Sequence, residues 1–467
     1  MNLQLLTDLY EFSMANGYYA TLPHDRQARF DVFYRRVPDN GSFVIVAGLQ
    51  QVVEQVQNWH FTKENIEYLT SLNEFTPEFL DYLSKIKNHC SIKALPEGTP
   101  VFPREPIISI SGPLIEAQLL ETFILNIINH QSLIATKSWQ INHAAQGRPI
   151  MEFGARRAQG PDAATYGARA AVIGGCTSTS NLQAASQFNI PAAGTMAHAW
   201  VESFSDELSA FQAWAKVYPD KVSLLVDTYD VLKSGVPNAI RVFKQVSAQG
   251  HQPVGIRIDS GDISQLAIKA RKMLDEAGFP DAVISASNAL DAHVVKSLLD
   301  EGAPIDNFGI GERLITSSSS PVLSGVYKLA EEKINDQWIP KIKVSDSREK
   351  ITLPGNKQVI ADVIALADEH ITAPLKVVNA NSAVTHASQV LTNFNAKPLM
   401  QEYLGSNASP IKNDLFKIQQ FSMDQVAELP EATKRLVNPD RYPVYLTATL
   451  VELQEQLITK AQFTEEY

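Results

Sequence analysis

From about Arg148 onward, short apolar runs alternate with longer segments whose apolar residues recur every three or four positions, such as Ile263 to Ala277. The apolar runs are PIMEFG, VSLLVD, PVGIRID, AVISAS and NFGIG. Alternation of this kind predicts parallel strands joined by helical crossovers. Polar residues gather where the runs end, which is where barrel active sites are built, so we expect an irregular α/β barrel. An open doubly wound sheet has the same periodicity and is the alternative.

The regions on either side of this alternation have other patterns. Two β-rich runs flank Pro38 to Gly41, which predicts a hairpin, and a long apolar helix follows Pro113. We therefore expect an N-terminal α+β domain over residues 1–147 and the barrel over residues 148–345. Residues 346–467 are less regular, and we expect part of this C-terminal region to complete the N-terminal domain.

Composition limits the compartment and the partners of the chain. Of the 467 residues, 45% are hydrophobic, and scattered Asp and Glu give a net charge of -11. Without a basic patch, we expect no nucleic-acid partner. The start has no signal-peptide pattern, Cys90 and Cys176 stand far apart, and Glu116 and Glu121 interrupt the most apolar run. These features predict a cytoplasmic protein without a membrane anchor.

The strongest single motif is GIRIDSGD, residues 255–262. An apolar strand ends here in Arg257 and Asp259, and alternate residues of a strand point to the same side. A guanidinium and carboxylates at a barrel mouth suit a phosphate or polyol ligand, with or without Mg²⁺. Asp262 opens the next helix, so a role as N-cap explains it equally well.

Two further strand ends have groups that suit an anionic ligand. In NFGIGERLIT, Gly309 and Gly311 leave backbone N–H groups accessible to a phosphate, although a plain turn also explains them. In MEFGARR, Arg156 and Arg157 follow a strand. Surface arginines are usually solvated, but a pair at a strand end is what a pyrophosphate needs.

His198 lies in GTMAHAWVESF among small and apolar residues. A lone histidine in such surroundings is more often a core residue than a catalytic one. Asp227 closes the strand SLLVD and is a carboxylate that can orient the ring of a catalytic histidine. The residues by themselves leave both alternatives open.

Taken together, seven blocks of the chain resemble the nicotinate phosphoribosyltransferase family. They occur in the same order between residue 7 and about residue 329: TDLYEFSMANGYY, EFGARRAQGPDAATYGARAAVIGGCTSTSN, GTMAHAWV, LLVDTYD, VGIRIDSGD, FGIGERLIT and GVYKL. The resemblance implies the type II phosphoribosyltransferase fold and a homodimer with shared active sites. It also implies that nicotinate and 5-phosphoribosyl 1-pyrophosphate form nicotinate mononucleotide and pyrophosphate, coupled to ATP hydrolysis, in NAD biosynthesis.

The resemblance implies a nicotinate subsite and a catalytic group. A Tyr10 contributed across the dimer would stack on the pyridine ring, with Phe153 on its other face. Arg257 and Thr195 would hold nicotinate, with the guanidinium facing its carboxylate. The histidine that matches His198 is phosphorylated by ATP in this family.

The same resemblance implies a phosphate and ribose subsite. Arg156, Asp259 and Asp262 would position the pyrophosphate and the ribose, with Mg²⁺, and the backbone at Gly309 and Gly311 would take the 5-phosphate. We place Asp259, together with Asp227, beside His198 as a catalytic candidate.

One residue departs from the family pattern, because relatives often have Thr where this chain has Glu312. An acidic side chain beside a phosphate is unfavourable unless it turns away or meets a cation. Two other functions are alternatives: a nicotinamide phosphoribosyltransferase, and a non-catalytic relative that keeps the fold to bind a ligand. The hydroxyls of GGCTSTSN and the GTMAHAW block favour the nicotinate enzyme.

Overall fold

The computed structural model describes residues 3–369, 371, 375–379, 388–391, 397–411 and 414–464. The chain forms two compact units. Unit 1 comprises Met1–Leu133, Val322–Asp414 and Gln420–Tyr467, and unit 2 comprises Ile134–Pro321 and Leu415–Gln419. The first boundary falls within the long helix α6 (Glu121–Ala145).

Unit 2 contains six parallel strands in the order β7-β6-β11-β10-β9-β8. The connections from β6 to β7 and from β8 through β11 all move the chain in the same direction along this order, and the connection from β7 to β8 leads from one edge to the other. The last strand, β11, pairs with the first, β6. With right-handed crossovers, a constant direction places all connecting helices on one face, as in a barrel. The edge strands β7 and β8 leave the ring open, and the expected irregular α/β barrel is confirmed. The strands are β6 (Ile150–Glu152), β7 (Ser178–Thr179), β8 (Ser223–Leu225), β9 (Gly255–Ile258), β10 (Val283–Ala286) and β11 (Asn307–Ile310).

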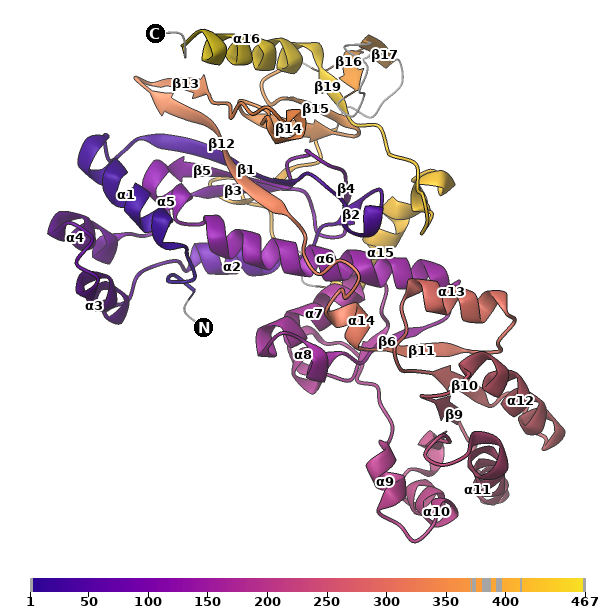
Figure 1. The fold of residues 1–467 in the computed structure, drawn as a ribbon. Helices are drawn as coiled ribbons and strands as arrows, with labels where there is room; N and C mark the ends of the chain where they lie inside the picture. Colours follow the sequence, from indigo (N-terminus) through magenta and orange to yellow (C-terminus); the bar gives the residue numbers. More distant parts are fainter. Residues whose placement is uncertain are drawn as a thin grey trace. The chain divides into compact units, whose positions relative to one another are not determined.

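The helices of unit 2 follow these strands, and Figure 1 shows α11, α12 and α13 beside β9, β10 and β11. The strands are mostly buried, as parallel strands covered by helices are. The helices are α7 (Pro161–Ile173), α8 (Leu182–Phe188), α9 (His198–Glu202), α10 (Glu207–Val217), α11 (Val236–Ala248), α12 (Ile263–Glu276), α13 (Ala292–Asp300) and α14 (Glu312–Ile315).

Unit 1 is built on a sheet in the order β13-β12-β1-β5-β3-β18, in which β1 pairs antiparallel with both β12 and β5. Strands β12, β13 and β18 come from after the barrel, so later segments complete the N-terminal domain as expected. The strands are β1 (Gln27–Tyr34), β3 (Ser91–Ala94), β5 (Ile108–Pro113), β12 (Gly325–Ile334), β13 (Gln337–Pro340) and β18 (Gln401–Leu404). The range expected for the barrel, 148–345, includes β12 and β13, which the structure assigns to unit 1.

Besides the first part of α6, five helices of the N-terminal region contribute to the buried core of unit 1. They are α1 (Leu9–Thr21), α2 (Leu49–Gln57), α3 (Lys63–Ser71), α4 (Pro77–Lys85) and α5 (Leu114–Gln118). Helices α3 and α4 begin at the N-caps Thr62 and Thr76, whose side chains accept backbone N–H groups. In the parts of the chain that the structure describes, no helix is both long and apolar enough to cross a membrane.

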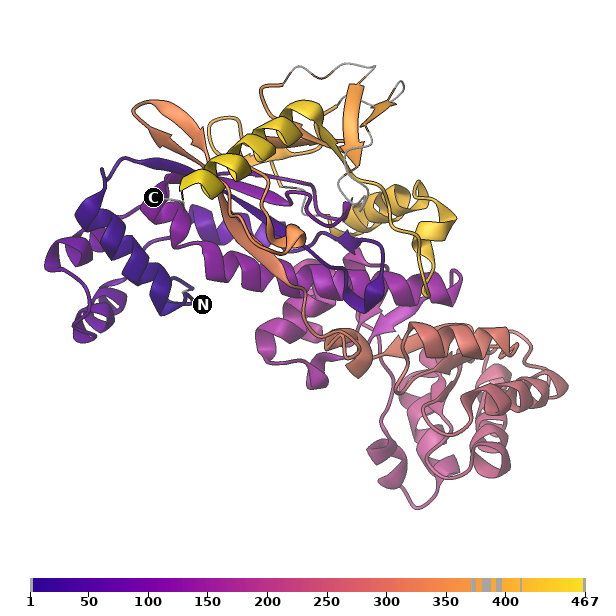
Figure 2. The same cartoon turned by 45° about the horizontal axis from the view of Figure 1, so that its top comes forward.

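A second sheet of unit 1 has the order β14-β15-β19-β16-β17. Its strands are β14 (Lys357–Ile360), β15 (Val363–Leu366), β16 (Leu375–Asn379), β17 (Ser388–Leu391) and β19 (Tyr445–Thr447). Helix α16 (Ala448–Thr464) packs on β15, β16 and β19, and Figures 1 and 2 both show it along this sheet. Helix α15 (Leu415–Ala427) precedes β19 in the chain.

The hairpin predicted around Pro38 to Gly41 is wrong. Strand β2 (Val44–Ile45) pairs with β4 (Pro100–Val101), because both edges of β1 are already occupied by β12 and β5. A turn does form at this place, where Asp39 and Asn40 have φ angles of 55° and 53°. The local turn signal was therefore correct, but its pairing partner was not.

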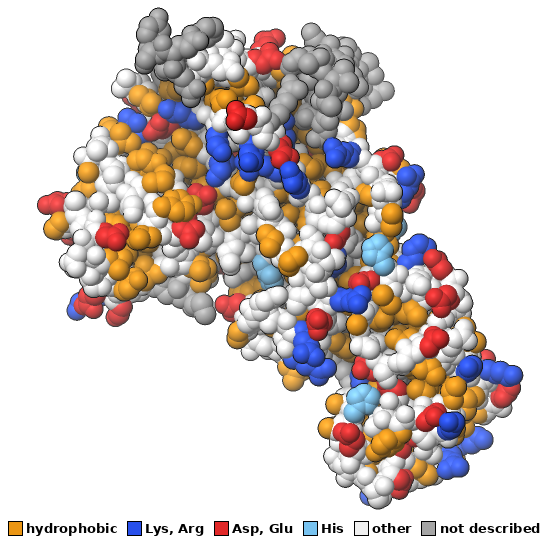
Figure 3. Space-filling view, in the orientation of Figure 1, with side chains coloured by type: hydrophobic (Ala, Val, Ile, Leu, Met, Phe, Trp, Pro, Cys, Tyr) orange, Lys and Arg blue, Asp and Glu red, His pale blue; other side chains and the backbone are white. Residues whose placement is uncertain are grey.

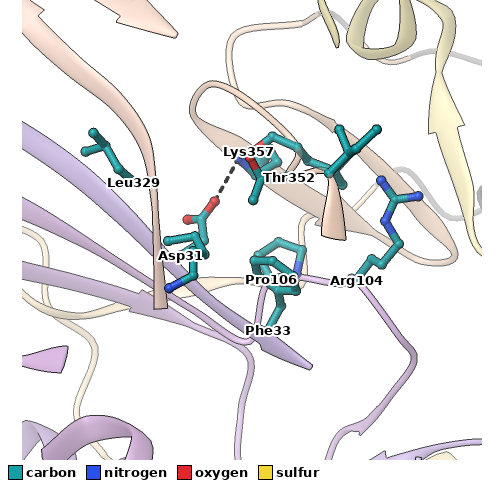
Figure 4. A pocket seen from close by; sticks show the side chains of 10 residues that line it. Asp31, Phe33, Arg104, Pro106, Leu329, Thr352 and Lys357 are labelled. Atoms are coloured by element: carbon teal, nitrogen blue, oxygen red, sulfur yellow. Dashed lines mark hydrogen bonds and ion pairs between the residues drawn. The ribbon is translucent and has the colours of Figure 1, made fainter. Parts of the chain in front are cut away.

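A buried ion pair joins the two larger sheets of unit 1. Lys357 Nζ lies 2.8 Å from Asp31 Oδ2, and the side chains are 3% exposed each. The same amine donates to the carbonyl oxygens of Leu353 at 2.8 Å and Gly355 at 2.7 Å. Figure 4 shows the pair beside a small cavity lined by Phe33 and other residues. Two carbonyl acceptors and the opposite charge of Asp31 thus together compensate the removal of the ammonium group from water.

We expect Lys357→Met to destabilise unit 1 by about 3–5 kcal/mol, because it leaves a buried carboxylate without its cation. The double variant Asp31→Asn/Lys357→Met should lose less than the single variant. Urea denaturation followed by circular dichroism measures both. Lys85→Met is the control, because Lys85 forms a mostly exposed pair with Asp81 and should change stability little. Equal effects of Lys357→Met and Lys85→Met would contradict the prediction.

Candidate active site

The polar groups of unit 2 gather where its parallel strands end. Phe153 follows β6, Asp227 lies two residues after β8, Asp259 follows β9, Ser287 follows β10 and Gly311 follows β11. Parallel strands have their carboxyl ends at one edge of the sheet, so these residues share that edge. Except for Tyr10, every sequence-predicted site residue lies in unit 2.

His198 is the first residue of α9, and its ring lies between a hydroxyl and a carboxylate. Nδ1 is 3.1 Å from Oγ1 of Thr228, and Nε2 is 3.9 Å from Oδ2 of Asp259. The side chain of His198 is 41% exposed. The ring is therefore held in position without being packed into the core, which favours the functional alternative for this residue.

Asp227 takes a different place from the one that sequence reasoning suggested. Its Oδ2 accepts the backbone N–H of Asp259 at 3.0 Å and the hydroxyl of Ser260 at 2.7 Å. The contacts of the His198 ring are instead with Thr228 and Asp259. Asp227 thus holds the turn after β9, which begins with Asp259. Its Oδ1 is buried and has no hydrogen-bond partner among the described residues.

Arg257 links strand β9 to the segment that precedes His198. Nη1 donates to Oγ1 of Thr195 at 3.0 Å, and Nη2 donates to the carbonyl oxygen of Met196 at 2.8 Å. Burial lowers the pKa of Arg257, and the carboxylates of Asp259 and Asp227 oppose that shift. Because the pKa of an arginine is far above neutral pH, Arg257 keeps its charge there. The structure thus brings together Arg257 and Thr195, the two residues expected to hold one carboxylate.

Phe153 packs directly on the glycine-containing end of β11. A Cβ added to Gly309 would lie 2.5 Å from Cε2 of the Phe153 ring, and one added to Gly311 would lie 2.9 Å from the Phe153 carbonyl oxygen. The backbone N–H of Phe153 donates to Ile310 O at 2.8 Å. Both glycines are therefore required by close packing, whether or not a phosphate binds there.

The arginines after β6 differ in their surroundings. Arg156 is exposed, and its charge acts on Arg257. Arg157 Nε lies 3.5 Å from Oε2 of Glu312, with both side chains about 60% exposed. Arg313, next in the chain, pairs with Asp291, the N-cap of α13. Glu312 thus meets a cation, which is one of the two conditions under which its charge is tolerated near a phosphate.

Asp262 is the N-cap of α12, and its Oδ1 accepts the backbone N–H of Gln265 at 3.2 Å. The capping interpretation is confirmed, and the ligand role stays a prediction. Tyr10 lies on α1 of unit 1 with a side chain that is 49% exposed. Partial burial raises the pKa of Tyr10 to about 12, and the carboxylates of Glu121, Glu11 and Asp8 add to the shift.

Three polar residues of this edge were not found by sequence reasoning. Thr228 contacts the His198 ring, Ser287 donates a hydrogen bond to Asp259, and Glu152 is a fully buried carboxylate at the end of β6. Asn288, after Ser287, has a φ angle of 103°, a strained conformation of the kind that clusters at functional sites. Their position at or shortly after the ends of strands was the available signal, but Ser and Thr are too common at turns to stand out.

Gly309→Ala tests the packing of Phe153. We expect the added Cβ to displace the ring and to lower stability by about 1–3 kcal/mol, as overpacking does. Adding Phe153→Leu should recover part of this loss. Thermal denaturation measures both variants, with Gly17→Ala as control, because a Cβ there meets nothing within 4 Å. A Gly309→Ala protein as stable as the unchanged chain would show that the ring does not occupy this position.

Comparison with known proteins identifies the family. Three profiles match: the nicotinate phosphoribosyltransferase N-terminal domain over residues 5–129, the nicotinate phosphoribosyltransferase family over 149–378 and its C-terminal domain over 353–454. The chain is 41% identical to nicotinate phosphoribosyltransferase of Bacillus subtilis over 458 residues, which cover 96% of this chain and 93% of that protein. The corresponding protein of Caenorhabditis elegans is 31% identical, with 97% and 93% covered.

A solved structure agrees with this assignment. The crystal structure of human nicotinic acid phosphoribosyltransferase matches with a TM-score of 0.85 and 28% identity, over 97% of this chain and 100% of the human chain. A nicotinate-nucleotide pyrophosphorylase from Pyrococcus furiosus, with a TM-score of 0.70 and 20% identity, shares the fold. By sequence and by structure, the chain belongs to the nicotinate phosphoribosyltransferase family.

Proposed function

We propose that the chain transfers the phosphoribosyl group of 5-phosphoribosyl 1-pyrophosphate to nicotinate, and that ATP hydrolysis through a phosphohistidine at His198 is coupled to this transfer. The observation that carries the proposal is the partly exposed ring of His198, whose Nε2 faces Asp259 at the strand edge that also contains Arg257. The expected cytoplasmic location fits these soluble substrates and stays a prediction.

The geometry at His198 favours Nε2 as the nucleophile. When the ring proton is on Nδ1, this N–H donates a hydrogen bond to Oγ1 of Thr228, and the lone pair of Nε2 is available for attack. Nε2 then forms a bond to the γ-phosphorus of ATP, the bond from that phosphorus to the β-γ bridging oxygen breaks, and ADP leaves. Thr228 acts by holding the tautomer and the direction of the ring.

The carboxylate of Asp259 lies 3.9 Å from Nε2, and a negative charge so close to an incoming phosphate is unfavourable without a cation. Mg²⁺ fits this place, since Asp259 and the unpartnered buried Oδ1 of Asp227 are oxygen donors of the kind it binds. No group of three or more His, Cys, Asp or Glu that could hold a metal occurs among the described residues. When bound, Mg²⁺ would neutralise phosphate charge, with substrate oxygens completing its ligands.

The transfer step needs charge neutralisation and alignment rather than a general base. The pyridine nitrogen of nicotinate has no proton to lose, so its lone pair attacks the anomeric carbon of the ribose as the bond to pyrophosphate breaks. Arg156 is suited to the charge of the leaving pyrophosphate, and Phe153 is suited to stack on the pyridine ring.

The preference for nicotinate over nicotinamide rests on Arg257. Two of its guanidinium nitrogens already orient it toward Thr195 and Met196, and a carboxylate is a stronger partner for a cation than an amide is. Product formation measured with each base, with and without ATP, tests the proposal. A clear preference for nicotinamide would favour the first alternative, and no product under saturating substrates would favour the non-catalytic one.

We expect γ-labelled ATP to leave an acid-labile label on the protein and His198→Ala to abolish it. His251→Ala is the matched control: His251 precedes β9 at the opposite end of the strands and pairs with Asp220. Its replacement should leave labelling intact. Equal labelling of the His198→Ala protein would exclude this residue as the acceptor.

We further propose a homodimer in which Tyr10 of one subunit completes the site of the other. Residues around the start of α1 expose apolar surface: Leu6 is 41% exposed, Leu9 and Tyr10 49% each and Met14 37%. Figure 3 shows hydrophobic side chains gathered on this part of unit 1. A contiguous exposed apolar surface is typical of an interaction site.

Tyr10→Ala should raise KM for nicotinate about tenfold by removing an aromatic contact, and Tyr10→Phe should not. Tyr68→Ala, a change at another exposed tyrosine, is the control. Mixed dimers of Tyr10→Ala and His198→Ala subunits provide a second measurement, because shared sites regenerate one intact site per dimer. Mixtures without any gain in activity would contradict shared sites.

A further inference from the structure

Glu152 is a buried carboxylate to which the proposed mechanism assigns no role. It is the last residue of β6 and is 0% exposed. Its Oε2 accepts a hydrogen bond from Thr179 Oγ1 of β7 at 2.6 Å, and its Oε1 accepts one from the backbone N–H of Gly154. Burial raises the pKa of Glu152, and the two hydrogen bonds counter that effect. A group that is costly to bury calls for an explanation.

The hydrogen bonds around Glu152 form a chain with one direction. The N–H of Asn181 donates to Oγ1 of Thr179 at 3.0 Å, and the single hydroxyl proton of Thr179 is then available for Glu152. The backbone carbonyl of Glu152 accepts from Ser180 N at 2.9 Å. The segment after β7 is thus connected through Glu152 to the turn after β6.

Gly154 lies between the carboxylate and helix α14. A Cβ at this position would lie 2.5 Å from Cβ of Ile315 and 2.8 Å from Oε1 of Glu152. The turn after β6 therefore passes through a narrow gap between Glu152 and Ile315. The backbone N–H of Gly154 donates to the Glu152 carboxylate on one side of this gap. Phe153 lies immediately before Gly154, and the carbonyl of Gly154 accepts from Arg157 N at 2.8 Å. The place of Gly154 consequently sets the directions of Phe153 and of the Arg156 segment.

We propose that Glu152 is a positioning residue for substrate binding: its carboxylate, fixed by Thr179, holds the turn that presents Phe153 and Arg156. The proposal rests on the proposed function, in which these two residues contact the pyridine ring and the pyrophosphate. Displacement of a positioned group by about 1 Å can lower reaction rates substantially. Loss of these hydrogen bonds should therefore weaken the binding of both substrates, nicotinate and 5-phosphoribosyl 1-pyrophosphate.

The test compares variants of the partner, Thr179, because they leave the buried carboxylate in place. Thr179→Val removes the donor at nearly constant volume, and Thr179→Ser retains it. We expect Thr179→Val to raise KM for nicotinate and for 5-phosphoribosyl 1-pyrophosphate about tenfold, and Thr179→Ser to stay within about twofold of the unchanged enzyme. Glu152→Gln, which places an amide N–H₂ group against a donor, should have an effect at least as large as that of Thr179→Val.

Glu116→Gln separates positioning from general stability. Glu116 is a buried carboxylate of unit 1 that accepts from the backbone N–H of His89 at 2.7 Å. Its replacement should lower the melting temperature without changing either KM. Thr179→Val with unchanged KM values, in an assay where the unchanged enzyme forms product, would overturn the role of Glu152. Absence of product from the unchanged enzyme would instead overturn the proposed function.

Discussion

The parallel pairing of the six strands β6, β7, β8, β9, β10 and β11 is the constraint on which the rest of unit 2 depends. Backbone hydrogen bonds between parallel strands bring their carboxyl ends to one edge, so residues far apart in the chain meet there. Asp227 and Asp259, which follow β8 and β9, are neighbours for this reason. The segment that connects the edge strands β7 and β8 contains Thr195 and His198. Arg257 of β9 holds this segment by donating hydrogen bonds to Thr195 and Met196.

Three charged side chains that are removed from water, one in unit 1 and two in unit 2, are held by polar partners. Arg257 donates to a hydroxyl and a carbonyl, Glu152 accepts from a hydroxyl and an N–H, and Lys357 contacts three acceptors. Such groups cost several kcal/mol to bury alone, so each one specifies the position of its neighbours. In unit 2 these same groups orient the strand-end turns, which ties the shape of the site to the stability of the barrel.

Local patterns predicted much of the fold. The helices near Lys63 and Pro77, the strands around Arg257 and Phe308, and the N-cap at Asp262 follow from periodicity and capping residues, which act within a few positions. The two-residue strand β7 was not predicted because it is too short to show a period. The prediction of a hairpin near Pro38 was wrong because the local sequence specifies a turn but not that later strands occupy both edges of β1.

The sequence by itself determined the alternation of strands and helices, the residue types at the strand ends and the family to which they belong. These are local properties, or properties of residue order, and neither needs coordinates. Only the tertiary structure decided that the His198 ring contacts Thr228 rather than Asp227, that Glu312 meets Arg157, and that Glu152 supports the turn after β6. Those contacts depend on which strand ends become neighbours and on the side-chain directions there, and both are set by packing across the whole barrel.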